Sequence, residues 1–576
     1  MLQRLKLLIP LLLLCAVATS STRSAWSQTA TPVTTATVVD ATAADATAAD
    51  AGGDKTGSAK DLADASAGPN ETAQKSLQAL DAHTMYGPGM QFLADSVGQN
   101  RIGTNMMWLL LCGFMVMFMQ AGFALVETGF TRAKSACHTM MMNLCIYFIG
   151  IIGFWAFGYA LMYGAAGGSG VANLGGLAPF SDSSKVSIEG FGSLFATKGW
   201  FLSGGSYDVA ICAMFLFQVV FMDTAATIPT GAMAERWKFS AFIVFGFFVS
   251  IILYPIFGHW AWGGGWLSQL GNNFGLGVGY VDFAGSGVVH AVGGFCGLAG
   301  AMVLGPRLGK YNRDGTANAI PGHNIPLALL GVLVLGFGWF GFNSGSTFGA
   351  SGAGNLRIGV VAVTTMMASA GGAFAVLMYM MIRTGKPDPS MVANGFLAGL
   401  VSITAPCAFV SPSVGVLIGA IGGLIMVWAV SFLDLVRVDD PVGAVAVHAG
   451  AGLWGMLAVG IFADGTYGNG WNATLDAAGN SVPLVGLLHG GTGQFFAQLI
   501  GVVTVVIWGF GASYAFFKIQ DQVMGIRSSR EDELGGLDIP EMGIVAYPPD
   551  TVDPDNLDED EPVSTIPNEG RVAAAY

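Results

Sequence analysis

Two histidines lie in apolar segments that resemble each other. His290 is in "DFAGSGVVHAVGG", which starts at Asp282, and His448 is in "DPVGAVAVHAGAG", which starts at Asp440. Each histidine follows its aspartate by eight residues, with Val before it and Ala after it. A neutral imidazole donates a hydrogen bond from one ring nitrogen and accepts one at the other. Two such rings in an apolar surrounding could therefore hold a small neutral amine or relay a proton.

Apolar helices must position these rings. Hydrophobic residues make up 53% of the 576 residues and charged residues only 11%, where a soluble domain carries about 25% charge. The pattern predicts an all-α membrane protein, since a span needs about 20 apolar residues. We expect eleven transmembrane helices, at 105–130, 140–164, 207–233, 239–261, 283–305, 325–348, 358–382, 391–410, 413–433, 442–463 and 491–517.

The duplicated segments fall in the fifth and tenth of these spans, which therefore run in opposite directions. This predicts a 5+5 inverted repeat with one further helix. Asp282 and Asp440 would each begin a helix, where a carboxylate complements the helix dipole. Eight helical residues rise about 12 Å, so both histidines should lie near the midplane. A single polar residue in a membrane helix often only bonds a neighbouring helix, but the duplication favours a functional pair.

The remaining segments set the domain organisation. Residues 1–28 have the pattern of a secretory signal peptide; the alternative, a first membrane helix, has too short an apolar run. Residues 29–100 are rich in Ala, Thr, Asp and Gly and predict a disordered extracytoplasmic segment. Residues 101–517 would form the transmembrane domain and 518–576 a cytoplasmic tail. Ten Lys and Arg in the expected inner loops, against three in the outer loops, predict an N-out/C-in orientation in the cell membrane.

The chain resembles the ammonium transporter family (Amt/Mep/Rh), and within it the bacterial-type Amt branch. The resemblance covers about residues 105–547. It rests on seven stretches: "MQAGFALVETGFTRAKSA" (119–136), "GAMAERWKFSA" (231–241), "HWAWGGG" (259–265), "DFAGSGVVH" (282–290), "GWFGFNSGS" (338–346), "DDPVGAVAVHAGAGLWG" (439–455) and "GLDIPEMGIVAY" (536–547).

The resemblance implies roles for residues along a pore. His290 and His448 are similar to the twin pore histidines of the family, and Phe221 and Phe342 to its stacked phenylalanine gate. It also implies a homotrimer with one pore per subunit, and regulation of the cytoplasmic face by a trimeric protein of the PII class.

An external ammonium-recruitment site is implied as well. Trp262 and Ser346 resemble its parts, and Asp282 resembles the acid beneath it that supports binding or deprotonation. Trp262 could instead be a residue of the interfacial aromatic belt. Asp223 departs from the family, because many members have a small residue there. Its carboxylate could be a cation or proton site, or could bond to a neighbouring helix.

The chemistry of these residue types suits ammonium. An aromatic face attracts a cation by about 0.5–2 kcal/mol, and a serine oxygen can accept a hydrogen bond that potassium cannot donate. Moving an intact ion through an apolar pore is expensive. Deprotonating an amine of pKa about 10.4 at pH 7 costs only about 4–5 kcal/mol. The expected function is nitrogen uptake by ammonium transport, with either neutral ammonia or net ammonium ion crossing.

Two alternatives stay open: an ammonium sensor that signals to a PII-type partner, and an Rh-like channel for a neutral gas. The tail carries no kinase-like motif, and the aromatic recruitment motif disfavours the gas channel. The sequence contains no phosphate loop, HExxH motif or serine nucleophile elbow. We therefore expect no enzyme, no cofactor, no metal site and no nucleic-acid partner.

Overall fold

The computed structural model describes residues 87–164, 185–351 and 357–548. The predicted signal peptide, most of the predicted disordered segment and the end of the tail lie outside the described residues. Helix α5 begins at Gly87, so residues 87–100, which we predicted to be disordered, are helical instead. The helix extends beyond its membrane-crossing part, which starts at Ile102, although the added turns contain Pro88 and three glycines. Pro88 is the second residue of the helix, where proline is tolerated.

The first group of helices lies between Gly87 and Leu304 and includes the segment that carries His290. It comprises α5 (Gly87–Phe130), α6 (Ala136–Gly153), α7 (Tyr159–Tyr163), α8 (Val209–Met233), α9 (Phe239–Phe248), α10 (Tyr254–Ala261), α11 (Leu270–Phe274) and α12 (Val292–Leu304). Short π-helical turns join neighbours into longer rods: η3 (Phe154–Gly158), η8 (Val249–Leu253) and η9 (Ser286–Ala291).

The second group carries His448 and the short helices near the C-terminus. It comprises α13 (Ile325–Gly345), α14 (Ile358–Thr384), α15 (Pro389–Ile403), α16 (Pro412–Leu435), α17 (Ala451–Phe462), α18 (Thr492–Val505), α19 (Gly511–Met524) and α20 (Arg530–Gly535). Its π turns are η11 (Ala446–Gly450), η14 (Val506–Phe510) and η15 (Asp538–Met542). The one described sheet is a hairpin of antiparallel strands β1 (Lys185–Ile188) and β2 (Gly192–Ala196).

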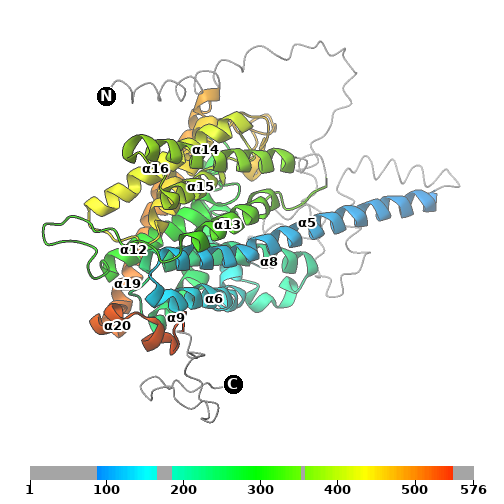
Figure 1. Cartoon of the computed structure of the whole chain (residues 1–576). Helices are drawn as coiled ribbons and strands as arrows, with labels where there is room; N and C mark the ends of the chain where they lie inside the picture. The colour runs from blue at the N-terminus through cyan, green and yellow to red at the C-terminus, as the bar shows by residue number, and fades with distance from the viewer. Residues whose placement is uncertain (1–86, 165–184, 352–356, 549–576) are drawn as a thin grey trace, which may run out of the picture.

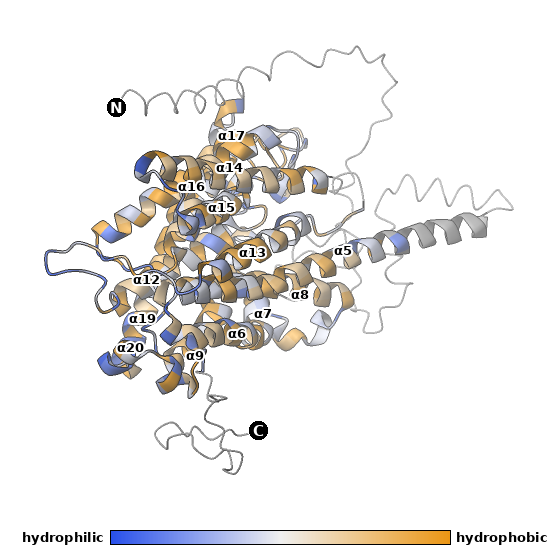
Figure 2. Ribbon diagram, viewed as in Figure 1, coloured by the Kyte–Doolittle hydropathy of each residue, from blue (hydrophilic) through white to orange (hydrophobic). Residues whose placement is uncertain are grey.

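The helices pack into one bundle (Figure 1). Helices α14, α15 and α16 contact one another on one side, and α5, α6, α8 and α9 form the other, with α12 and α13 between them. The N-terminal end of α5 projects beyond the bundle, and α20 lies at the opposite end in this view. Hydrophobic residues colour most of the helix ribbons (Figure 2), as expected of helices in a membrane.

Nine helices in the described part are long and apolar enough to cross a membrane. Two further apolar helices, Pro389–Ile403 and Ala446–Phe462, coincide with the expected eighth and tenth spans but are shorter. Both are shorter than the roughly 20 residues of a full span, because turns replace helix at 404–410 after the first and at 441–443 before the second. Nine helices of the described residues therefore reach the length of a span, and the number of eleven stays a prediction.

A buried ion network lies at the end of the bundle where α8 ends. The Arg307 guanidinium lies 2.6 Å from Glu235 Oε1 and 2.8 Å from Asp439 Oδ2, and Arg132 pairs with the other oxygen of Glu235. Burial alone would raise the pKa of Asp439, but Arg236 and the hydrogen bonds from Arg307 hold it below its usual value. The network ties the loop that leads to Asp440 onto the end of α8.

Candidate functional site

The two predicted histidines meet inside the bundle. His290 Nδ1 and His448 Nδ1 lie 3.1 Å apart, and the rings are stacked at 25° with centroids 5.2 Å apart. Both rings are buried, with His290 fully covered and His448 5% exposed. Since one Nδ1 must donate and the other accept, the neutral pair holds its rings in opposite tautomers. His290 Nε2 has no hydrogen-bond partner among the described residues, so it is available to a small guest.

The repeat is visible in the local backbone. His290 lies in the π turn η9 and His448 in the π turn η11. Asp282 Oδ1 accepts from Gly285 N, and its Oδ2 accepts from the amides of Gly287 and Val288, at 2.8–2.9 Å. Asp440 Oδ2 accepts from the amides of residues 445 and 446. The prediction that both acids stabilise helix starts is confirmed.

Two equivalent glycines let the histidine segments approach. Gly294 and Gly452 each follow their histidine by four residues. A Cβ on Gly294 would lie 2.3 Å from Ala449 N, and one on Gly452 would lie 2.7 Å from Ser286 O. Each glycine thus rests against the backbone beside the other histidine, the close approach that small residues permit between membrane helices.

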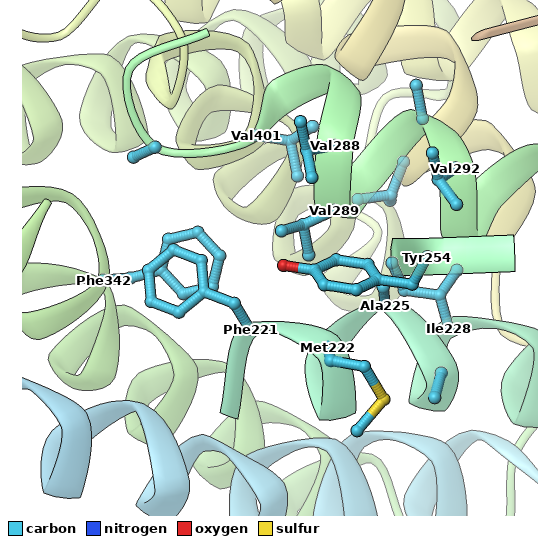
Figure 3. Packing of buried hydrophobic residues seen from close by; sticks show 14 of the residues in the cluster. Phe221, Met222, Ala225, Ile228, Tyr254, Val288, Val289, Val292, Phe342 and Val401 are labelled. Carbon is cyan, nitrogen blue, oxygen red and sulfur yellow. The ribbon is translucent and has the colours of Figure 1, made fainter. Parts of the chain in front are cut away.

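Aromatic rings continue from the histidine pair toward the opposite end of the bundle. The Phe221 and Phe342 rings face each other (Figure 3) at 21° with centroids 3.9 Å apart. Phe342 lies 5.5 Å from His290 on one side, and Phe221 lies 6.3 Å from Trp262 on the other. Trp262 and the predicted gate residues therefore form one row with the histidines, although the row draws on α8, α13, η9, η11 and the residue after α10.

Hydrogen bonds fix each of the three residues of the expected recruitment site. Trp262 Nε1 donates to the main-chain oxygen of Asp282 at 2.6 Å, which fixes the indole beside the start of η9. Ser346 Oγ donates to Phe342 O at 2.9 Å and so keeps its lone pairs as acceptors. The Asp282 carboxylate is buried and both its oxygens are engaged by backbone amides and by Tyr280. Asp282 thus contacts Trp262 through its main-chain oxygen and the first amides of η9 through its carboxylate.

Asp223 lies apart from this row. It follows Phe221 by two residues on α8, so it projects about 200° around the helix from the aromatic gate. Its side chain lies near Gly150 of α6, because a Cβ there would be 4.0 Å from Asp223 Oδ1. The structure therefore does not bring this acid to the aromatic and histidine residues.

Residues that the sequence reasoning missed complete the row. Trp339 stacks on His290 with centroids 5.1 Å apart and donates from Nε1 to Thr404 Oγ1 at 2.9 Å. Phe123 lies 6.1 Å from His448, on the side away from Phe342. Trp339 precedes Phe342 by one helical turn within "GWFGFNSGS", which was a signal available in the sequence. Phe123 carries no comparable signal, because many apolar helix positions are Phe.

Comparison with known proteins shows the family to which this chain belongs. The Ammonium Transporter Family model matches residues 107–547, which contain every residue of the site. The chain belongs to the ammonium transporter family. Ammonium transporter Amt2 of Archaeoglobus fulgidus is 47% identical over 459 residues, covering 79% of this chain and 91% of the relative. Ammonium transporter Amt1 of Haloferax mediterranei is 37% identical, covering 77% and 80%.

Solved structures of ammonium transporters share the fold. A structure titled "Sensor Amt Protein" is 35% identical with a TM-score of 0.65, covering 77% of this chain and 98% of its own. Mep2 of Candida albicans is 26% identical with a TM-score of 0.61, covering 74% and 87%. The named relatives of this protein are ammonium transporters rather than enzymes. Together with the apolar helices, they indicate a multi-pass membrane protein.

Proposed function

We propose that the protein conducts ammonium across the cell membrane along the row that runs from Trp262 to the histidine pair. The observation that carries this proposal is the stacked pair Phe221 and Phe342, which adjoins the hydrogen-bonded imidazoles of His290 and His448. The chain that forms this row belongs to the ammonium transporter family, and its named relatives are ammonium transporters.

Recruitment begins at the aromatic end of the row. The Trp262 face attracts a cation, and Ser346, which donates to Phe342 O, offers lone pairs to an N–H donor. Ammonium can donate such a bond and potassium cannot, so these two residues together favour ammonium. Asp282 contributes by holding the Trp262 indole through its main-chain oxygen.

Beyond the gate the environment favours ammonia over ammonium. Phe342, Trp339 and the two imidazoles present a buried and mostly apolar lining, where an intact ion loses its hydration. Loss of the proton costs about 4–5 kcal/mol for an amine of pKa about 10.4 at pH 7. The unpartnered His290 Nε2 then exchanges a hydrogen bond with ammonia. The paired Nδ1 atoms offer a route for the proton, so net transfer of ammonium ion is the form we favour.

The membrane arrangement belongs to the same proposal. We infer eleven transmembrane helices, with the short helices Pro389–Ile403 and Ala446–Phe462 as crossings that begin or end in irregular backbone. Support for a 5+5 inverted repeat comes from the matched π turns and from the glycines four residues after each histidine. Residues 1–28 would be a signal peptide and residues 518–576 cytoplasmic, which gives the N-out/C-in orientation.

Assembly and regulation are proposed on family membership. We infer a homotrimer with one row of site residues per subunit, and a PII-class partner at the inner face. Sensing of ammonium is a second candidate, favoured by the 35% identity to the protein titled "Sensor Amt Protein". In that case occupancy of the site would change the inner face rather than serve uptake.

The test is an ammonium concentration jump on proteoliposomes adsorbed to a solid-supported membrane. The full chain is expected to give an ammonium current, which Phe221→Ala and His290→Ala reduce or abolish. Ser250→Ala, at a buried hydroxyl outside the row, is the matched control and should keep the current. A potassium current without an ammonium current would refute the substrate. Uptake of ammonia with no current would refute the electrogenic form alone.

A further inference from the structure

A polar seam lies between α8 and the helices α5 and α6, on the side of α8 opposite Phe221. We define it by Asp223, Thr227 and Thr230 of α8, Gln120 and Glu127 of α5, and Asn143 of α6. The three residues of α8 are spaced by four and three positions, so they form one stripe on the face opposite Phe221. Both carboxyl groups of the seam are 2% exposed.

Hydrogen bonds connect most of the seam. Thr227 Oγ1 donates to Gln120 Oε1 at 3.0 Å, and Gln120 Nε2 donates to the main-chain oxygen of Asn143 at 2.5 Å. The Asn143 amide donates to Glu127 Oε2, and Thr230 Oγ1 also donates to Glu127, both at 2.8 Å. These contacts cross the α5–α8 and α5–α6 interfaces, in a region where polar side chains are expensive.

The two acids of the seam have different surroundings. Both oxygens of Glu127 accept hydrogen bonds, from the Asn143 amide and from the Thr230 hydroxyl. Asp223 Oδ1 has no hydrogen-bond partner within residues 87–164, 185–351 and 357–548. None of the ion pairs found there includes either acid. The titratable group that faces Asp223 is the phenol of Tyr147 on α6, and from α5 the seam presents the neutral Gln120.

A buried carboxylate without a cation beside it is neutralised rather than left charged. A metal ion would require several oxygen ligands, and no cluster of three or more His, Cys, Asp or Glu is found among the described residues. The burial of Asp223 and the lack of a cation beside it therefore favour a proton as its ligand.

The seam also has an inner end. Glu127 follows Phe123 by one turn of α5, and a Cβ on Gly231 would lie 3.2 Å from Glu127 Oε1 and 2.6 Å from Val442 Cγ2. Glu127 is thus next to the loop that leads from Asp440 into η11. The distance along α8 between Asp223 and Thr230 is about 10 Å, and Thr227 supplies a hydroxyl between them.

We propose that Asp223 is a proton-binding site, separate from the aromatic and histidine row, and that its proton exchanges with the inner side along the seam. The proton binds a carboxylate oxygen of Asp223 to form a neutral carboxylic acid. Release restores the carboxylate and delivers the proton toward Glu127. The site goes beyond ammonium conduction, because Asp223 lies on the back of the helix whose opposite face carries Phe221.

Infrared spectroscopy of the full chain in liposomes tests this proposal. The wild type is expected to show the carbonyl stretch of a protonated carboxylic acid, which shifts when H2O is replaced by D2O. Asp223→Asn should lose one component of that band, whereas Glu127→Gln should keep this component and slow its exchange at least about tenfold. Ser250→Ala, whose buried hydroxyl lies outside the seam, is the matched control and should change neither the band nor the exchange.

Isotope labelling keeps the test decisive if Asp223→Asn fails to fold. In the wild type, carbon-13 at the side-chain carboxyl of aspartate should shift this component, and labelled glutamate should leave it in place. A band in which no component follows the aspartate label, or a band of unchanged intensity in folded Asp223→Asn, would overturn the proton site. A band that keeps its H2O position in D2O, or unchanged exchange in Glu127→Gln, would overturn the route. An ammonium current in the wild type is a separate readout, so failure here leaves the proposed transport intact.

Discussion

Replacing Asp282 by Asn is expected to destabilise the protein much more than replacing Asp440 by Asn. The two acids occupy equivalent places in the repeated segments, but their oxygens are used differently. Asp282 accepts with both oxygens, one from Gly285 N and the other from the amides of Gly287 and Val288. Asp440 accepts with Oδ2, and its Oδ1 has no partner among the described residues.

The size of the difference follows from counting acceptors. An asparagine offers one oxygen and places an NH2 group where the second oxygen was. At position 282 that NH2 group must face a backbone N–H, which removes a charge-assisted bond and leaves a buried donor unpaired. We estimate about 2–4 kcal/mol for Asp282→Asn. At position 440 the amide oxygen can take the Oδ2 place and the NH2 group the unpartnered one, so the cost should be below about 1 kcal/mol.

Thermal unfolding of the purified full chain in detergent, with the ammonium current as a second readout, measures this difference. Asp388→Asn is the control, because Asp388 caps α15 through a single oxygen and should behave like Asp440→Asn. Asp282→Asn should also lower the current, since η9 carries His290. Equal unfolding midpoints for the variants at 282 and 440, or a lower midpoint at 440, would refute the reasoning.

Other predictions concern the inner end and the histidine contacts. Burial raises the pKa of Asp440 to about 6, so the folded state binds more protons than the unfolded state from about pH 4 to pH 6. Wild-type stability should therefore fall as pH rises through that window, and the fall should be smaller in Asp440→Asn when unfolding midpoints are measured against pH. Arg307→Met should cost about 3–5 kcal/mol in unfolding, because it removes the ion pair of buried Asp439 and one of the two arginine partners of buried Glu235. The matched change Lys310→Met, at a more exposed pair, should cost below about 1 kcal/mol; equal costs would contradict the ranking. Trp339→Phe should keep the stack on histidine while losing the bond to Thr404, with a loss of about 1 kcal/mol and most of the ammonium current retained. A current as low as that of Trp339→Ala would show that the bond, not the stack, matters.

Much of the site could be predicted from the sequence. The duplicated Asp-to-His spacing predicted that His290 and His448 belong together, and the two rings are in hydrogen-bond contact. The acids at the helix starts were predicted from helix-terminus chemistry, which is local and depends only on nearby residues. The role of these residues in transport remains a proposal that the current measurements must test.

Other features could not be predicted because they depend on packing between distant segments. The π turns at both histidines shift every later side chain around its helix, and nothing in the apolar pattern marks them. The helical start at Gly87 was missed because composition alone suggested disorder. The expected eighth and tenth spans are shorter than predicted, since apolar runs do not show where irregular backbone replaces helix.

The sequence by itself determined that this is a helical membrane protein with two repeated histidine segments, because hydrophobicity and residue spacing are local properties of the chain. Only the tertiary structure decided which oxygens of Asp282 and Asp440 are engaged, and that Asp223 faces α6 rather than the aromatic gate. The physical reason is that a helix presents a residue to one neighbour only. Which neighbour that is depends on how helices far apart in the sequence pack together.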